Sequence, residues 1–290
     1  MSDSSTTWAK AVAFNKLHIP GDPVILPNAW DPVSANIIAS AGAAAVATSS
    51  AAVSWAHGRR DGSGLNRYEV IQATARISQS VEVPVSADIE SGYGADDGDL
   101  AVTLRGILDA GVVGINLEDS GTSDPAAPLW PVELAARRVQ VARAVAAERG
   151  VPMYLNARID TFIAEAGPPE GRLAETLHRA EEYLAAGASG IFVPAVSDLR
   201  VIEQLVAGIE GPVNILVGPG SPPVAELAEL GVARISTGSS LAAAALGFLH
   251  RAAADVMAEG RYTHLEGKIA YSDLNAFFPA DPGTSNGFRR

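Results

Sequence analysis

Short apolar runs recur along this chain, and each one follows a helical stretch and a glycine. Four segments show the pattern: IASAGAAAVATSS from Ile38, LDAGVVGINLEDS from Leu108, LAAGASGIFVPAVS from Leu184 and AELGVARISTGSS from Ala228. Glycine commonly ends a helix in the left-handed conformation. A short apolar run without polar alternation is typical of a strand buried on both faces of a parallel sheet. The pattern therefore predicts successive helix–strand units.

Extended to the whole chain, the pattern predicts eight strands, at 24–26, 43–48, 83–87, 113–117, 153–157, 190–194, 213–217 and 233–237. The expected helices cover 32–41, 67–80, 98–110, 132–149, 172–186, 198–208, 222–230 and 240–258. Strands recur about every 30 residues, as right-handed β-α units do. Eight units indicate an α/β fold, a (β/α)8 TIM-type barrel. The alternative is an open doubly wound sheet, which is disfavoured because no G-x-G-x-x-G turn follows the first strand.

The two ends of the chain lie outside this repeat. The N-terminal run is expected to form a helix across the bottom of the barrel. Residues 1–290 are interpreted as a single barrel domain, in which about 240–290 form a C-terminal helical extension. From Arg261 onward, the tail is expected to pack against a neighbouring subunit or against its own barrel.

Composition narrows the classes of function. A net charge of −12 argues against a nucleic-acid partner, which needs clustered Lys and Arg. The absence of cysteine excludes disulfides, thiolate nucleophiles and Cys-ligated zinc. No signal peptide is visible, and the most apolar stretch, Leu241 to Ala254, is too short and interrupted to span a bilayer. The sequence therefore predicts a cytoplasmic protein without a membrane partner.

Carboxylates follow the third and fourth predicted strands. Asp88 and Glu90 are two residues apart, and therefore on one side of the third strand, and Glu118 ends the fourth. In a barrel these ends meet at the rim that carries the chemistry, where unpaired carboxylates would repel one another. Mg²⁺ or Mn²⁺ favours such oxygen ligands. A divalent metal site is therefore expected, to which Asp61 on the long second loop would add a fourth acid.

Further polar residues follow the other strands. Arg158 ends the fifth strand, and its planar fork suits a substrate carboxylate bound through two hydrogen bonds. Asn28 and Trp30, after the first strand, are further candidates for substrate binding. Two alternatives remain open: a single strand-end acid can be an N-cap or a solvated charge, and Arg158 can simply pair with Asp160 or Glu118.

The motifs resemble those of the isocitrate lyase/phosphoenolpyruvate mutase superfamily, from about Leu17 to Gly260. PGDPVILPNAWDPVSANII is similar to the first strand and helix of that family, and DIESGYG to its metal motif, commonly D-x-D-x-G-Y-G. NLEDS is similar to its next strand and NARID to its arginine strand. The motifs match in order and spacing as well as in composition.

The resemblance implies a (β/α)8 barrel with Mg²⁺ at its rim. Asp88 would bind the metal directly, while Asp61, Glu90 and Glu118 would hold its waters. Arg158, with the backbone amides around Ser49, Ser50 and Ala51, would bind the carboxylate and the 2-oxo oxygen of a small carboxylate substrate. The resemblance thus makes Arg158, Glu118 and Asp61 the candidate catalytic residues. It also implies a homo-oligomer, a dimer or a tetramer, in which a helix after Ala242 is exchanged between subunits.

The chain departs from the family pattern at two places. Glu90 stands where the family usually has a second Asp. The loop DSGTSDPAAPLWP, after Glu118, lacks the K-x-C-G-H of the isocitrate and methylisocitrate lyases, and it also lacks the Lys and Asn of the phosphonopyruvate enzymes. Those lyase activities are therefore not expected, and phosphoryl transfer is a weaker interpretation.

The remaining chemistry is cleavage of a carbon–carbon bond in a small 2-oxo or 2-hydroxy carboxylate, by a retro-aldol or retro-Claisen reaction or by decarboxylation. An enolate of the pyruvate type would be stabilised by the metal. No lysine lies at a predicted strand end, which excludes a Schiff base. The proton donor would be water, Tyr93, a loop residue such as Ser123, or His57. A phosphonopyruvate-type hydrolase or mutase and a non-catalytic 2-oxo-acid binding protein are the alternatives.

Overall fold

The computed structural model describes residues 4–62, 64–121, 124 and 126–278. The chain separates into two compact units, Met1–Ala242 and Ala243–Arg290. The second unit begins close to the start of the expected C-terminal extension.

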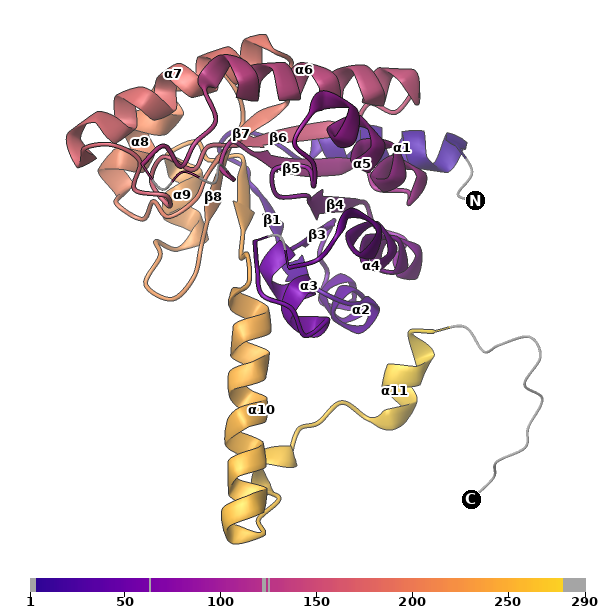
Figure 1. Cartoon of the computed structure of the whole chain (residues 1–290). Coiled ribbons are helices and arrows are strands. Elements are labelled where there is room, and N and C mark those ends of the chain that lie inside the picture. Colours follow the sequence, from indigo (N-terminus) through magenta and orange to yellow (C-terminus); the bar gives the residue numbers. More distant parts are fainter. Residues whose placement is uncertain (1–3, 63, 122–123, 125, 279–290) are drawn as a thin grey trace. The chain divides into compact units, whose positions relative to one another are not determined.

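The first unit is built on one parallel sheet of nine strands, in the order β1-β9-β8-β7-β6-β5-β4-β3-β2 (Figure 1). The strands are β1 Val24–Leu26, β2 Asn28–Ala29, β3 Val46–Thr48, β4 Val85–Asp88, β5 Gly114–Glu118, β6 Tyr154–Arg158, β7 Gly190–Val193, β8 Val213–Leu216 and β9 Arg234–Ser236. Strands from β3 to β9 neighbour one another in chain order, as repeated β-α units do. The predicted α/β barrel is confirmed; the eight predicted strands differ from the observed ones only at their ends, and β2 is an additional strand.

The sheet is nearly closed through the segment that carries both β1 and β2. β1 pairs with β9 and β2 pairs with β3, and Pro27, which has no amide hydrogen, separates the two. The Asn28 side chain joins both neighbours. Its Oδ1 accepts hydrogen bonds from the amides of Thr237 (3.0 Å) and Gly238 (2.9 Å), and its Nδ2 donates to the Thr48 carbonyl (2.8 Å). The strand predicted at 24–26 is β1, and the unpredicted strand β2 completes the closure of the barrel.

Helices surround the sheet (Figure 1). They are α2 Pro32–Ser40, α3 Ser50–Ala56, α4 Arg67–Ser80, α5 Asp97–Asp109, α6 Val132–Glu148, α7 Arg172–Ala185, α8 Leu199–Gly208 and α9 Val224–Glu229. α3 is absent from the prediction, because its seven residues are too few to show a helical period. It begins after Ser49, whose side chain accepts a hydrogen bond from the Ala52 amide.

Helix α1 (Ser4–Lys16) lies at the N-terminal ends of the strands, as predicted. Ala11 and Phe14 are fully buried and pack with Leu26 and Tyr154 inside the barrel. Gly114 leaves space for the Phe14 ring, because a Cβ at residue 114 would lie 2.5 Å from that ring. The carboxyl ends of the strands are thereby left as the open rim.

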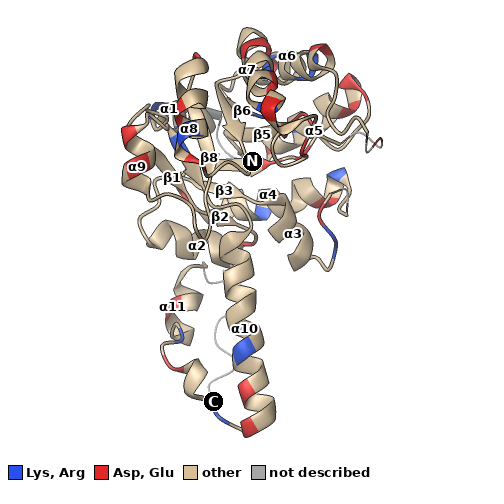
Figure 2. Ribbon diagram, turned by 90° about the vertical axis from the view of Figure 1, so that its left-hand side faces the viewer, with Lys and Arg blue, Asp and Glu red and all other residues tan. Residues whose placement is uncertain are grey.

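The second unit contains most of helix α10 (Ser240–Glu259) and the short helix α11 (Tyr271–Ala276). Figure 2 shows α10 as largely uncharged, with its charged residues in its C-terminal half. In the part of the chain that the structure describes, α10 is the one helix long and apolar enough to cross a membrane, with a mean hydropathy of 1.3. It is longer than the sequence stretch judged too short to do so. Length and composition alone do not distinguish a membrane span from a helix that packs against protein.

Candidate metal and substrate site

The turn after β4, DIESGYG, has an unusual backbone. Glu90 and Tyr93 have φ values of 48° and 54°, in the left-handed region that residues with a Cβ seldom adopt. Gly92, with φ of 96°, packs so closely that a Cβ would lie 2.4 Å from Leu100. Such strain persists only where the surroundings hold it in place.

Two arginines from the surrounding helices hold this turn. Arg67 of α4 donates to the Tyr93 carbonyl (2.9 Å) and forms an ion pair with Asp99. Arg138 of α6 is buried and donates to the Ser91 carbonyl. Together they bind two backbone oxygens of the turn, and so hold the backbone that carries Glu90.

Asp88 is anchored by its neighbours on β3 and α3. Its amide donates to Thr48 Oγ1 (2.9 Å), and its Oδ2 accepts from the Ser50 hydroxyl (3.0 Å) and amide (3.3 Å). The Glu90 amide donates to its Oδ1 (3.3 Å). The carboxylate is therefore held in one orientation at the rim by donors on both oxygens.

Arg158, at the end of β6, lies between two carboxylates. Its Nη1 is 2.6 Å from Glu118 Oε2, and its Nε is 2.6 Å from Asp160 Oδ1. The Ser120 hydroxyl bonds to both acids, at 3.1 Å from Glu118 Oε1 and 2.6 Å from Asp160 Oδ2. The pairing that the sequence left open as an alternative is thus present with both acids. It does not by itself exclude substrate binding, because the guanidinium carries five N–H groups.

A second buried network, centred on Asp119, supports the ion pair between Arg158 and Asp160. Asp119 accepts the Asp160 amide (2.9 Å) on Oδ1. On Oδ2 it accepts the Tyr183 hydroxyl (2.8 Å) and Arg179 Nη1 (3.1 Å), both from α7. Burial is the main factor that raises the pKa of Asp119, and these donors oppose it. The network fixes the backbone of Asp160 and, through it, the position of Arg158.

Burial and the neighbouring charges shift the pKa of Glu118. Burial raises the pKa of the Glu118 carboxyl above its usual range, and Arg158 opposes that rise. The negative charges of Asp160, Asp88 and Glu90 raise it as well. Tyr93 donates its hydroxyl to Glu90 Oε1 at 2.8 Å. Burial, followed by the charge of Glu90, raises the pKa of Tyr93 far above its usual value, so the hydroxyl keeps its proton.

The donor chemistry of this rim fits a hydrated magnesium ion. In residues 4–62, 64–121, 124 and 126–278, no three His, Cys, Asp or Glu side chains are close enough to hold an ion jointly. Mg²⁺ commonly keeps several waters and binds through only one or two carboxylates. Asp88 presents oxygen ligands, and the mutual repulsion of Asp88, Glu90 and Glu118 is of the kind that a cation relieves.

The structure brings together Asp88, Glu90, Glu118 and Arg158, but it places other predicted residues elsewhere. Asp61 is exposed in the loop between α3 and α4 and, among the described residues, makes no contact with Asp88 or Glu118. Its role at the metal therefore stays a prediction.

The two candidates after the first strand have structural contacts. Asn28 uses its side chain to close the barrel, and Trp30 packs against the main core.

Other polar residues near the strand ends also have local contacts. Asp31 is the N-cap of α2. His57 ends α3 and bonds to the Val53 carbonyl. Substrate contact by Asn28 or Trp30 stays a prediction, as does the role of the amides from Ser49 to Ala51, and Ser123 lies outside the described residues.

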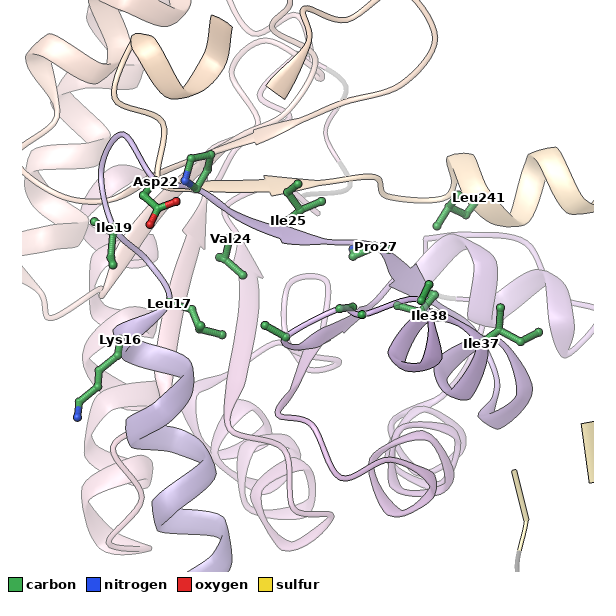
Figure 3. A pocket seen from close by; sticks show the side chains of 15 residues that line it. Lys16, Leu17, Ile19, Asp22, Val24, Ile25, Pro27, Ile37, Ile38 and Leu241 are labelled. Carbon is green, nitrogen blue, oxygen red and sulfur yellow. The ribbon is translucent and has the colours of Figure 1, made fainter. Parts of the chain in front are cut away.

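A broad apolar concavity lies on a different part of the barrel. It has a volume of about 710 Å³ and is lined by residues of β1, α1, α2 and the start of α10. Figure 3 shows Ile25, Ile37, Ile38 and Leu241 around it. Its lining is mainly apolar, with Lys16 and Asp22 as its charged members, and it contains none of the rim carboxylates, so it is suited to an apolar partner surface rather than to a small acid.

The sequence interpretation missed the supporting residues. Arg138, Arg179 and Tyr183 lie on helices, at positions that look like ordinary solvent-facing polar residues of an amphipathic pattern. One missed residue did carry a signal: Arg234 stands within the apolar strand VARIS, where a charge is unexpected.

Comparison with known proteins identifies the family. The family model of phosphoenolpyruvate phosphomutase matches residues 14–257. The chain therefore belongs to this family, within the phosphoenolpyruvate mutase/isocitrate lyase superfamily that the motifs indicated.

Individual relatives cover most of the chain. An uncharacterized protein of Mycobacterium tuberculosis is 35% identical over 268 residues, which are 91% of this chain and 95% of the relative. A crystal structure of a candidate phosphonomutase from Burkholderia cenocepacia J2315 is 41% identical, has a TM-score of 0.79, and matches over 83% of this chain and 98% of that one.

Two further proteins have named activities or ligands. An oxaloacetate decarboxylase of Ectopseudomonas mendocina is 30% identical over 190 residues, 61% of this chain and 60% of its own. A phosphonopyruvate hydrolase, whose crystal structure contains oxalate and Mg²⁺, is 21% identical with a TM-score of 0.81, over 92% of this chain and 94% of that one. The second likeness shows the fold alone.

Proposed function

We propose that this protein is a Mg²⁺-dependent lyase that cleaves a carbon–carbon bond of a small 2-oxo or 2-hydroxy carboxylate. Members of the superfamily include lyases, decarboxylases and hydrolases of such acids. The observation that carries the proposal is the rim itself: a fixed Asp88, two further carboxylates, and Arg158 beside them.

Each residue of the rim has a separate task in this proposal. Asp88 would bind Mg²⁺, or Mn²⁺, directly, and Glu90 and Glu118 would hold its waters. Bound there, the metal supplies a Lewis acid that polarises a 2-oxo oxygen. Arg158, with the amides from Ser49 to Ala51, would bind the carboxylate and orient the acid.

Tyr93 is the proton donor that the geometry favours among the candidates described. Its hydroxyl lies in the carboxylate cluster, 2.8 Å from Glu90 Oε1, whereas His57 lies at the end of α3 and bonds to the Val53 carbonyl. After bond cleavage, the Tyr93 hydroxyl would give its proton to the enolate carbon, C3, and the tyrosinate would take a proton from water before the next turnover. The strained turn and its two arginines would hold the hydroxyl in place.

The proposal is tested by following products. Purified protein with Mg²⁺ is incubated with oxaloacetate, substituted malates, methylisocitrate and phosphonopyruvate, and products are identified by NMR. Metal-dependent formation of a 2-oxo acid from a carbon acid supports the proposal. Release of phosphate or rearrangement of phosphonopyruvate identifies phosphonate chemistry instead. Stabilisation by oxalate or pyruvate without turnover of any compound identifies a binding protein.

We also propose that the chain forms a homo-oligomer in which α10 of a second copy covers the apolar concavity. Ile19 and Ile25 at the concavity are about half exposed, and so are Leu246 and Phe248 of α10. Apolar surfaces of this kind on both elements are typical of protein interfaces. Location in the cytoplasm likewise stays a prediction.

A further inference from the structure

Arg234 is a charged residue inside the barrel. It opens β9, is 1% exposed, and donates from Nη2 to Asn116 Oδ1 of β5 at 3.2 Å. β9 and β5 are separated by three strands in the sheet, so this hydrogen bond crosses the barrel interior. Its guanidinium therefore lies between the two sides of the barrel.

The layer that holds Arg234 lies directly beneath the rim. Asn116 is in register with Asp88 on one side and with Asn156 on the other. Asn156 also donates to Asn116 Oδ1, at 2.9 Å. Glu118 and Arg158 follow Asn116 and Asn156 by two residues, so their side chains leave the strands on the same inner side, one step nearer the opening.

The charge of Arg234 has no ion-pair partner among the residues that the structure describes, and its Nε and Nη1 have no hydrogen-bond partner there. A buried charge without a partner is costly, and its field is poorly screened in the interior. Burial lowers the pKa of Arg234 to about 10, which still leaves it charged at neutral pH. Asp88 is among the groups that favour its charged form.

We propose that Arg234 is a positioning residue that sets the charge balance of the metal site from below. This inference rests on the proposed function, because it assumes that Mg²⁺ and an anionic acid bind at the rim. A positive charge beneath the rim weakens the binding of Mg²⁺ alone and strengthens the binding of the anionic acid. A purely structural Arg234, acting only as a donor to Asn116, would not separate the two affinities.

The test measures two dissociation constants by calorimetry: that of Mg²⁺ alone, and that of oxalate at saturating Mg²⁺. Arg234→Met and Arg234→Gln remove the charge, and the glutamine keeps a donor for Asn116. We expect both variants to bind Mg²⁺ on the order of tenfold more tightly and oxalate on the order of tenfold more weakly. Arg234→Lys keeps the charge and is expected to restore both constants toward those of the wild type.

Arg143→Met is the matched control. Arg143 is half-buried, and it bonds to the carbonyls of Met153 and Gly187, at the N-terminal ends of β6 and β7. Its loss is expected to leave both constants unchanged. Unchanged constants in the Arg234 variants, or weakening of both ligands together, would overturn the role of Arg234. If the wild type binds neither ligand, the proposed function itself is wrong.

Discussion

Arg158 and Glu118 form an ion pair across neighbouring strands, with 2.6 Å between Nη1 and Oε2. β5 and β6 place the two residues directly in register, at the last position of each strand. The pair therefore joins the proposed metal side of the rim to the proposed carboxylate side. A ligand that binds both sides would compete with Glu118 for the same guanidinium.

Replacement of Arg158 by Lys tests the carboxylate side. A lysine cannot form two parallel hydrogen bonds to a carboxylate, and charged hydrogen bonds contribute about 1.5–3 kcal/mol. We expect oxalate binding with Mg²⁺ to weaken by roughly tenfold to a hundredfold. Arg105→Lys, at an exposed pair with Glu148, is the control and should bind oxalate normally. An oxalate affinity equal to the wild type in Arg158→Lys would show that Arg158 has only a structural role.

Removal of the Tyr93 hydroxyl tests the proton donor. In Tyr93→Phe we expect kcat to fall by about 10²–10⁴-fold, because the hydroxyl transfers the proton, while oxalate affinity changes little. The thermal stability of the variant is measured alongside, since loss of the bond to Glu90 costs about 1 kcal/mol. An unchanged kcat with the substrate found in the product assay would show that Tyr93 is not the proton donor.

His18 gives the fold a defined dependence on pH. Burial, and after it the charge of Arg234, lowers the pKa of this histidine from 6.5 to about 3. Below pH 6.5 His18 takes up a proton in the unfolded chain but stays neutral in the folded chain. The contribution of neutral His18 to the free energy of unfolding is therefore complete above pH 6.5 and declines below it. Between pH 7 and pH 5 the wild type should lose about 2 kcal/mol more than His18→Gln.

Urea unfolding at several pH values measures this difference in free energy. His178→Gln, at an exposed position on α7, is the control and should follow the wild type. Parallel curves for the wild type and His18→Gln would show that His18 is protonated in the folded protein too.

The apolar concavity gives a prediction about assembly. Ile25 is 46% exposed and lines the concavity, so Ile25→Glu places a charge on the proposed interface. We expect sedimentation analysis to show dissociation to smaller species. Val102→Glu, at a similarly exposed apolar position on α5, should leave the assembly unchanged. An intact oligomer in Ile25→Glu would place the interface elsewhere.

The repeated helix–glycine–strand pattern was enough to predict the barrel, because burial of a parallel strand on both faces leaves a clear apolar run. Asp88, Glu90, Glu118 and Arg158 could be found in the same way, since strand ends converge in this fold. The short strand β2 and helix α3 could not, because each depends on tertiary hydrogen bonds rather than on a local period.

The residues that hold the site in place could not be predicted from the sequence, for a different reason. Arg138 and Arg179 act through carbonyl groups and a carboxylate that are distant in the sequence, and nothing local distinguishes them from surface arginines. Asp61 was expected to add a fourth acid from the long second loop, and the resemblance implied the same; in the structure Asp61 is exposed.

The central claim is that Asp88 binds a metal on which turnover depends. The most direct measurement compares Mg²⁺ binding and product formation in the wild type, in Asp88→Asn, and in Asp109→Asn, an exposed acid paired with Arg149. We expect Asp88→Asn to remain folded but to lose both Mg²⁺ binding and turnover, while Asp109→Asn keeps both. Mg²⁺-dependent turnover at the wild-type rate in folded Asp88→Asn would contradict the account.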